Sequence, residues 1–177
     1  MPKIRSLFLA CHVVDDQSGI GKKVRAQVDA LSRAGFEVAL SHLAVDENCQ
    51  YSKRLVGDEL LEEYEDSLIL KRKWKWRLSF DAIFQYIVSK KVELLYIRYT
   101  HFSNPRFIRF LRRVKKLGVI VFVEIPTYPY DDEYRDAGKL LKASLWVERI
   151  SRKHFESCVD RILTYSDDIS ILSLIHI

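Results

Sequence analysis

A short glycine-containing stretch, Ser18-Gly19-Ile20-Gly21-Lys22, carries residue types that bind phosphate. Glycine lets the backbone approach a ligand closely, and the free N–H groups at the start of a helix attract anions. Lys22, Lys23 and Arg25 fall in the first helical turns, where the helix dipole disfavours cations, so a nearby anion would account for them. The spacing is neither that of a Walker A motif nor that of GxGxxG, and a plain loop with solvated lysines is an equal alternative.

A second candidate is Glu124, which ends the continuous apolar run Val119–Val123. Such a run, rich in β-branched residues, is typical of a strand that is buried on both faces of a parallel sheet. A buried carboxylate needs a partner, and ligands bind at the carboxyl edge of such sheets. We therefore predict a role for Glu124 in a site.

The elements that position these residues alternate between strand and helix. Apolar spacing and turn residues predict strands over residues 4–10, 37–42, 94–97, 119–123 and 162–165, a further strand over 67–70, and helices over 24–34, 80–88, 105–117 and 140–158. This alternation predicts an α/β fold, a Rossmann-like doubly wound parallel sheet, with ligand-binding loops after residues 10, 98, 125 and 165.

Composition is that of an ordinary globular protein. The chain has 177 residues, 48% hydrophobic and 30% charged, with a formal net charge of +5, which favours one domain and excludes a disordered chain. The cysteines are odd in number and widely spaced: Cys11, Cys49 and Cys158. We therefore expect neither a zinc site nor a disulfide framework, and we expect the protein to reside in a reducing cytosol. Lys3 and Arg5, followed by the apolar residues 7–11, could pass for a short signal or lipoprotein sequence, but the apolar run is short and a buried first strand is the stronger interpretation.

Two basic segments could meet an anionic membrane surface. Residues 71–77 mix five cations with two tryptophans, and the helix over 105–117 carries six cations and no acid. The candidate membrane residues are Lys73, Trp74, Trp76, Arg109, Arg112 and Arg113. A solvated face balanced by the acidic residues 58–66 is the alternative, and nucleic acid is not expected because no recognition motif accompanies the charge.

Three stretches together resemble a known family. Residues 18–38, which begin Ser-Gly-Ile-Gly and continue into a helix ending Ala-Gly-Phe-Glu-Val, are similar to the opening of family-four glycosyltransferases of the GT-B fold. Residues 95–99 and Glu124-Ile125-Pro126-Thr127-Tyr128-Pro129-Tyr130 fit as well, the latter being similar to the EIPTYPY segment of bacterial polysaccharide glycosyltransferases. The resemblance covers residues 3–171.

The resemblance implies an enzyme of two Rossmann-like domains. The N-terminal domain mostly binds the acceptor, and the C-terminal domain holds the nucleotide-sugar donor and carries an EX7E motif; transfer retains the anomeric configuration, usually without a required metal or other cofactor. The donor diphosphate faces the glycine loop, so Gly19 and Gly21 are implied to approach it. Ser18 stands where the family often has its first glycine.

Further site residues are implied less directly. Many members place a histidine after the strand that here ends near Ile97, where this chain has Arg98, with His101 three residues on. Arg98 could bind a phosphate or an acceptor carboxylate through its fork, and His101 could assist proton transfer or bind a sugar hydroxyl. A surface ion pair and a loop histidine are the alternatives. Thr127, Tyr128 and Ser166 complete the predicted donor-phosphate and acceptor site, with tyrosine packing as the alternative to sugar stacking.

We expect residues 1–171 to be the acceptor-side N-terminal half of a GT-B fold. Residues 172–177 match one reading frame of a sequencing-library adapter and are expected to be a non-native tail, with the donor domain absent and the fragment inactive alone. The expected acceptor is a sugar, which is often lipid-linked, and the expected location is the cytoplasm or the inner face of the cell membrane. The alternatives are a non-catalytic membrane-associated binding domain and a small nucleotide-binding Rossmann or flavodoxin-like protein.

Overall fold

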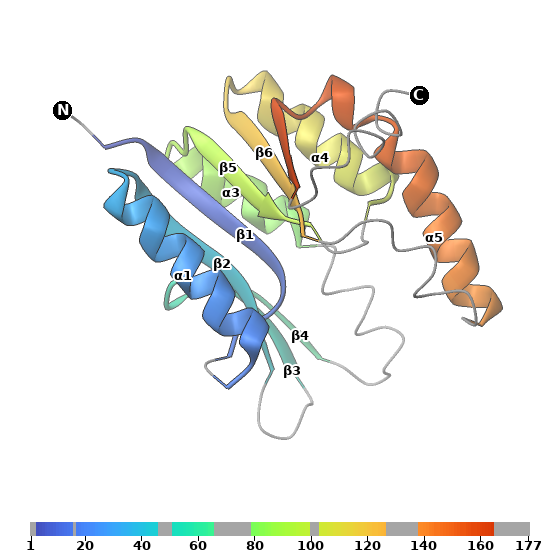
Figure 1. The fold of residues 1–177 in the computed structure, drawn as a ribbon, viewed down its shortest axis with the longest axis horizontal. Helices are drawn as coiled ribbons and strands as arrows, with labels where there is room; N and C mark the ends of the chain where they lie inside the picture. The colour runs from blue at the N-terminus through green and yellow to red at the C-terminus, as the bar shows by residue number, and fades with distance from the viewer. Residues whose placement is uncertain are drawn as a thin grey trace.

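The protein is built on one seven-stranded sheet with helices on both faces (Figure 1). The structure, a computed structural model, describes residues 3–15, 17–45, 51–65, 79–99, 103–126 and 138–164. The strands are β1 (Arg5–Val13), β2 (Glu37–Val45), β3 (Tyr51–Val56), β4 (Glu59–Glu65), β5 (Leu94–Arg98), β6 (Ile120–Ile125) and β7 (Arg161–Thr164). The helices are α1 (Gly19–Arg33), α3 (Phe80–Ser89), α4 (Pro105–Lys116) and α5 (Lys139–Arg152).

The strand order is β4-β3-β2-β1-β5-β6-β7, and β2, β1, β5, β6 and β7 run parallel. The predicted Rossmann-like α/β fold is therefore confirmed. The central strand β1 is apolar throughout its middle because both of its faces are covered. Leu7 and Leu9 belong to the core on one face, and Phe8 and Ala10 belong to the core on the other.

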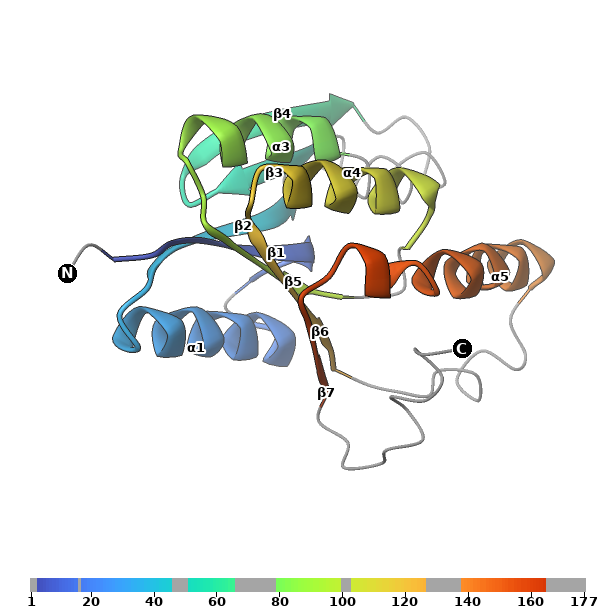
Figure 2. The same ribbon diagram turned by 90° about the horizontal axis from the view of Figure 1, so that it is seen from above.

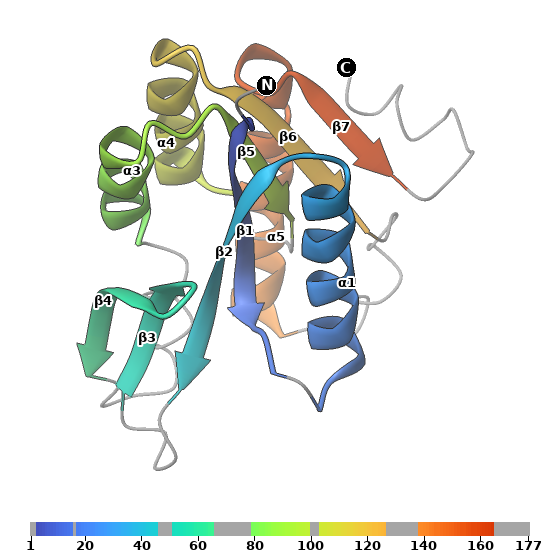
Figure 3. The same ribbon diagram turned by 90° about the vertical axis from the view of Figure 1, so that its left-hand side faces the viewer.

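Helices lie on opposite faces of this sheet (Figures 2 and 3). On one face α1 packs Val24 against Phe8 and Ala10. On the other face α3 and α4 cover a larger core, in which the rings of Phe80 and Phe107 lie 5.4 Å apart. Since α1 leaves β1 toward one face and the next helices occupy the other, the sheet is doubly wound.

Strands β3 and β4 form an antiparallel hairpin that the sequence analysis did not predict. Its two-residue loop begins at Gly57, whose positive φ of 56° suits the first loop position of a tight hairpin turn. Four acidic residues of this region lie on β4, where Glu63 pairs with Lys53 of β3 at 3.1 Å. The acids along β4 hid this strand, because a run of acids usually indicates a solvated segment. The predicted strand over 67–70 lies outside the described residues.

Helix ends follow local chemistry closely. The Asn104 side chain accepts hydrogen bonds from the backbone N–H groups of Arg106 and Phe107, and Pro105 occupies the first helical position, as predicted for α4. The last helix is shorter than predicted: α5 ends at Arg152, and a separate turn, Phe155–Ser157, follows. None of the helices within the described ranges combines the length and the apolar character needed to cross a bilayer.

Candidate functional site

The candidate site lies where the carboxyl ends of β1 and β5 meet. The chain passes from β1 through α1 to β2 on one side, and β5 lies on the other side of β1. In open α/β sheets this reversal of strand order leaves a crevice outside the carboxyl ends of the two strands, which is where ligands bind. Residues at the ends of β1, β5 and the adjoining β6 are therefore the ones that can meet a ligand.

Arg98 and Glu124 form a buried ion pair at this edge. They are register partners on the parallel strands β5 and β6, so their side chains leave the same face of the sheet side by side. The Arg98 Nη1 lies 2.5 Å from the Glu124 Oε1, and the two side chains are 6% and 2% exposed. The requirement that a buried Glu124 should have a partner is thus met by Arg98.

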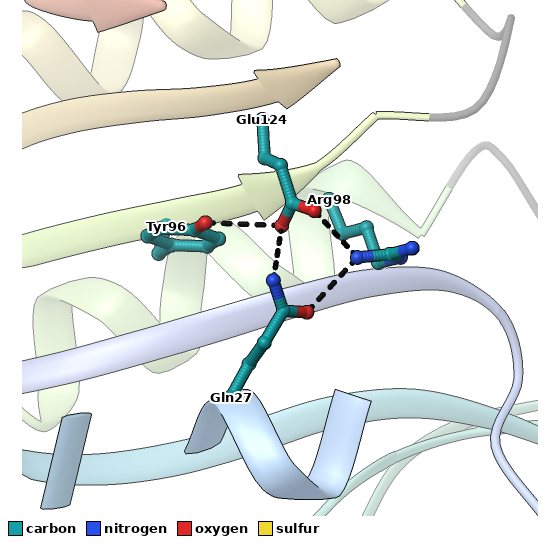
Figure 4. A network of polar contacts seen from close by, with 4 residues as sticks. All are labelled: Gln27, Tyr96, Arg98 and Glu124. Carbon is teal, nitrogen blue, oxygen red and sulfur yellow. Dashed lines mark hydrogen bonds and ion pairs between the residues drawn. The ribbon is translucent and has the colours of Figure 1, made fainter. Parts of the chain in front are cut away.

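Gln27 and Tyr96 complete a four-residue network around this pair (Figure 4). The Gln27 amide donates from Nε2 to Glu124 Oε2 at 3.0 Å and accepts at Oε1 from Arg98 Nη1 at 2.9 Å. The Tyr96 hydroxyl donates to the same Glu124 oxygen at 3.0 Å. Glu124 therefore accepts a hydrogen bond from each of Gln27, Tyr96 and Arg98, an arrangement that orients the Arg98 guanidinium.

The network fixes one terminal nitrogen of the Arg98 guanidinium against the side chains of Gln27 and Glu124. Both bonds to Gln27 and Glu124 use Nη1, whereas the other terminal nitrogen points away from these two side chains in Figure 4. A guanidinium fixed on one edge and open on the other can bind a phosphate or a carboxylate without losing much side-chain entropy. The geometry thus suits Arg98 to hold an anionic group in the crevice.

His12, which the sequence analysis did not single out, lies near the end of β1. Within the described part of the chain neither of its ring nitrogens has a hydrogen-bond partner, and both are shielded from solvent. Burial, followed by the charges of Arg98 and Arg54, lowers the pKa of His12 to about 4. Its imidazole is therefore neutral near neutral pH, with one donor and one acceptor unused. Its place directly after an apolar run was the only available signal in the sequence.

Arg54 of β3 also contacts β1 near its carboxyl end. Its Nη1 donates to the Ala10 carbonyl at 2.8 Å, and its Nε donates to the Ser79 hydroxyl at 3.0 Å. The side chain is 1% exposed. A fully buried arginine that bonds a strand carbonyl positions the hairpin β3–β4 and the start of α3 against the edge where the candidate site lies.

The two glycines of the loop have different surroundings. Ser18 is the N-cap of α1, and its hydroxyl accepts from the Gly21 N–H at 2.9 Å. An added Cβ at Gly21 would lie 1.8 Å from the Asp15 carbonyl oxygen, so Gly21 is required by the approach of the protein's own backbone. An added Cβ at Gly19 would meet nothing within 4 Å, which leaves Gly19 as the open face of the loop, beside the exposed Lys22.

A second buried network lies on the opposite face of the sheet. The Tyr99 hydroxyl donates to Glu148 of α5, and Arg152 Nε lies 3.7 Å from the same carboxylate. Burial, together with the charge of Glu148, raises the pKa of Tyr99 well above its usual value. Tyr99 therefore stays protonated and holds α5 against the end of β5.

Several predicted site residues lie outside the described residues: His101, Thr127, Tyr128, Ser166, Lys73, Trp74 and Trp76. Of the predicted membrane residues, Arg109 and Arg112 are exposed on α4. Arg113 instead pairs with Asp81 at 2.6 Å and its guanidinium lies 3.9 Å from the centre of the Phe84 ring. Among the residues with described positions, no group of three or more His, Cys, Asp or Glu side chains is placed to hold a metal ion.

Comparisons with known proteins were made for the whole chain. No protein-family model matches the chain, and no curated protein matches it either.

Proposed function

We propose that this chain is the acceptor-side domain of a nucleotide-sugar-dependent glycosyltransferase of polysaccharide or glycolipid biosynthesis. The observation that carries the proposal is the position of the buried Arg98–Glu124 pair at the carboxyl edge of the parallel sheet, with Arg98 on β5, the strand next to β1, and Glu124 on β6. The loop after β1 is the one whose sequence resembles the glycine loop of family-four glycosyltransferases. An arginine at the same carboxyl edge of the sheet as this loop suits a reaction in which a diphosphate leaves.

Arg98 has the central role in this proposal. Glu124 and Gln27 act as positioning residues that hold its Nη1, and the free edge of the guanidinium binds a phosphate of the donor or a carboxylate of the acceptor. Because the pair is buried, the interaction with a ligand anion is stronger than it would be at an exposed arginine.

The glycine loop supplies the second contact. Gly19 is exposed and its position has room for a ligand, and the N–H groups of the first helical residues face an approaching anion. In the proposal a second Rossmann-like domain binds the donor nucleotide-sugar. The diphosphate of this donor reaches the loop across an interdomain cleft. No metal or other cofactor takes part in the proposed roles of these residues.

The experiment uses the product of the source reading frame, including whatever follows residue 171. The purified protein is incubated with labelled nucleotide sugars and with oligosaccharide and lipid-extract acceptors, and transfer of label is measured. Arg98→Gln should lower kcat/KM by about 100-fold or more, because one preorganised charge contact to the reacting complex is lost. Arg161→Gln, the same substitution at an exposed position at the start of β7, is the matched control and should leave kcat/KM unchanged.

Two results would contradict the proposal. One is a folded product that transfers no sugar from any donor but binds flavin or a dinucleotide, which would favour a small nucleotide-binding protein. The other is an Arg98→Gln variant with undiminished transfer. Circular dichroism and thermal unfolding of each variant separate a loss of function from a loss of fold.

A further inference from the structure

Helix α4 carries cations that the rest of the structure does not neutralise. Of its six cations, Arg113 pairs with Asp81 and Lys115 pairs with Asp160. The other four are exposed, and none has an acidic partner among the residues that the structure describes: Arg106, Arg109, Arg112 and Lys116. Unpaired arginines on one helix repel one another unless an external anion is present, so this face is suited to an anionic partner.

A groove brings two of these arginines against α5. Its volume is about 320 Å³, and its lining combines Arg109 and Arg112 with the side chains of Ile108, Ile150 and His154. The cationic groups can meet a phosphate there, while the isoleucines offer an apolar wall.

Helix α5 adds exposed apolar side chains beside the groove. Trp146 is 65% exposed and Ile150, four residues on and therefore on the same face of the helix, is 42% exposed. Val147 between them is also exposed. The one acid in the described part of α5 that faces the core, Glu148, is held by Tyr99 and Arg152 and does not reduce the positive charge of this surface. Figure 2 shows α5 extending past the strands on the side of α4.

We propose that this α4–α5 surface docks on an anionic phospholipid bilayer, with lipid phosphates between Arg109 and Arg112 and with Trp146 and Ile150 at the depth of the headgroups. The charge complementarity argues for an anionic partner, and the exposed tryptophan beside it argues for a bilayer, since indole rings settle at the membrane interface. A free phosphate would use the arginines but not the apolar residues. The inference goes beyond glycosyl transfer and does not depend on it.

The first experiment measures co-sedimentation of the full chain with vesicles. Binding is expected to vesicles of phosphatidylcholine containing about one third phosphatidylglycerol, to weaken with added salt, and to be negligible for phosphatidylcholine alone. The variant Arg109→Gln/Arg112→Gln should bind about 25-fold more weakly, about fivefold for each cation removed. Lys3→Gln/Arg33→Gln removes the same charge from exposed positions near the start of β1 and the end of α1, and it should change binding by less than about threefold.

The second experiment reads the apolar contact directly. Replacing Trp74 and Trp76 by Phe leaves Trp146 as the last of the three tryptophans. Its fluorescence should shift to the blue on adding anionic vesicles and not on adding inorganic phosphate. Ile150→Ser should weaken vesicle binding, whereas Leu60→Ser, at a comparably exposed apolar position on β4, should not.

Four outcomes would overturn the proposal. They are equal binding to neutral and anionic vesicles, equal weakening by the two charge-removing variants, the lack of a Trp146 shift, and a preference for inorganic phosphate or single-stranded RNA over vesicles. The last would mark the groove as a site for a small anion or for a nucleic acid.

Discussion

Arg98 of β5 and Glu124 of β6 are opposite each other in the parallel register, and their side chains meet at 2.5 Å with almost no exposure to solvent. Burying both charges costs several kcal/mol of desolvation, which the attraction between them repays only in part. Such a pair is weak evidence for added stability and stronger evidence for a fixed geometry. Its place at the ligand-binding edge of the sheet is the reason to test it for function.

Removing one member of the pair should cost far more than removing both. Arg98→Met leaves Glu124 buried without its cation and should lower the free energy of unfolding by about 3–5 kcal/mol. The double variant Arg98→Met/Glu124→Leu should recover at least half of that loss, because no buried charge remains. Urea unfolding of both variants measures this difference. Equal losses in the single and double variants would show that the pair itself stabilises the fold.

The two glycines of the loop should respond differently to alanine. Gly21→Ala drives a Cβ into the Asp15 carbonyl and should destabilise the protein by about 1–3 kcal/mol or more, although alanine normally favours a helix. Gly19→Ala meets nothing, so stability should be equal or about 0.4–1 kcal/mol higher.

Gly19→Ala should affect function although it does not lower stability. If a diphosphate approaches this loop, Gly19→Ala should raise the KM for the nucleotide sugar while the protein remains fully folded, as the transfer assay and thermal unfolding together would show. An unchanged KM would mean that the loop serves only to start α1.

His12 should make stability depend on pH over a defined window. Its folded pKa of about 4 lies below the ordinary value of 6.5, so the unfolded chain binds the proton more readily. The stability associated with a neutral, buried His12 is therefore fully present above pH 6.5 and is lost as the pH falls from 6.5 through about 4. His12→Phe should lose less stability than the natural protein over that window. Parallel pH curves for the two proteins would contradict a shifted histidine.

Tyr99 and Glu148 should prove coupled across the other face of the sheet. Tyr99→Phe removes the hydroxyl that donates to a buried carboxylate and should cost about 1–3 kcal/mol of unfolding free energy. Adding Glu148→Leu should recover part of this loss, since both polar groups are then gone. A double-mutant cycle by urea unfolding gives the interaction energy, and simple additivity of the two losses would refute the coupling.

The residues of the sheet edge were partly predictable. Glu124 was predicted from an apolar run that ends in an acid, and Arg98 from its place after a strand in a chain that resembles a known family. Gln27 and Tyr96 gave no such signal: Gln27 lies on an ordinary helical face, 97 residues from the carboxylate that it contacts. The hairpin β3–β4 was missed as well, because acids along β4 suggested a solvated segment and its pairing with β3 is a property of the folded sheet.

The amino-acid sequence by itself determined the alternation of strands and helices, the cap of α4 at Asn104 and the parallel character of the core, because these depend on periodicity and on side chains a few residues apart. Only the tertiary structure decided that Arg98 faces Glu124, that Gln27 bridges them, and that Gly21 accommodates the Asp15 carbonyl. Such contacts depend on strand register and on the packing of α1 over the sheet. Both are set by the burial of the whole core, so no local pattern specifies them.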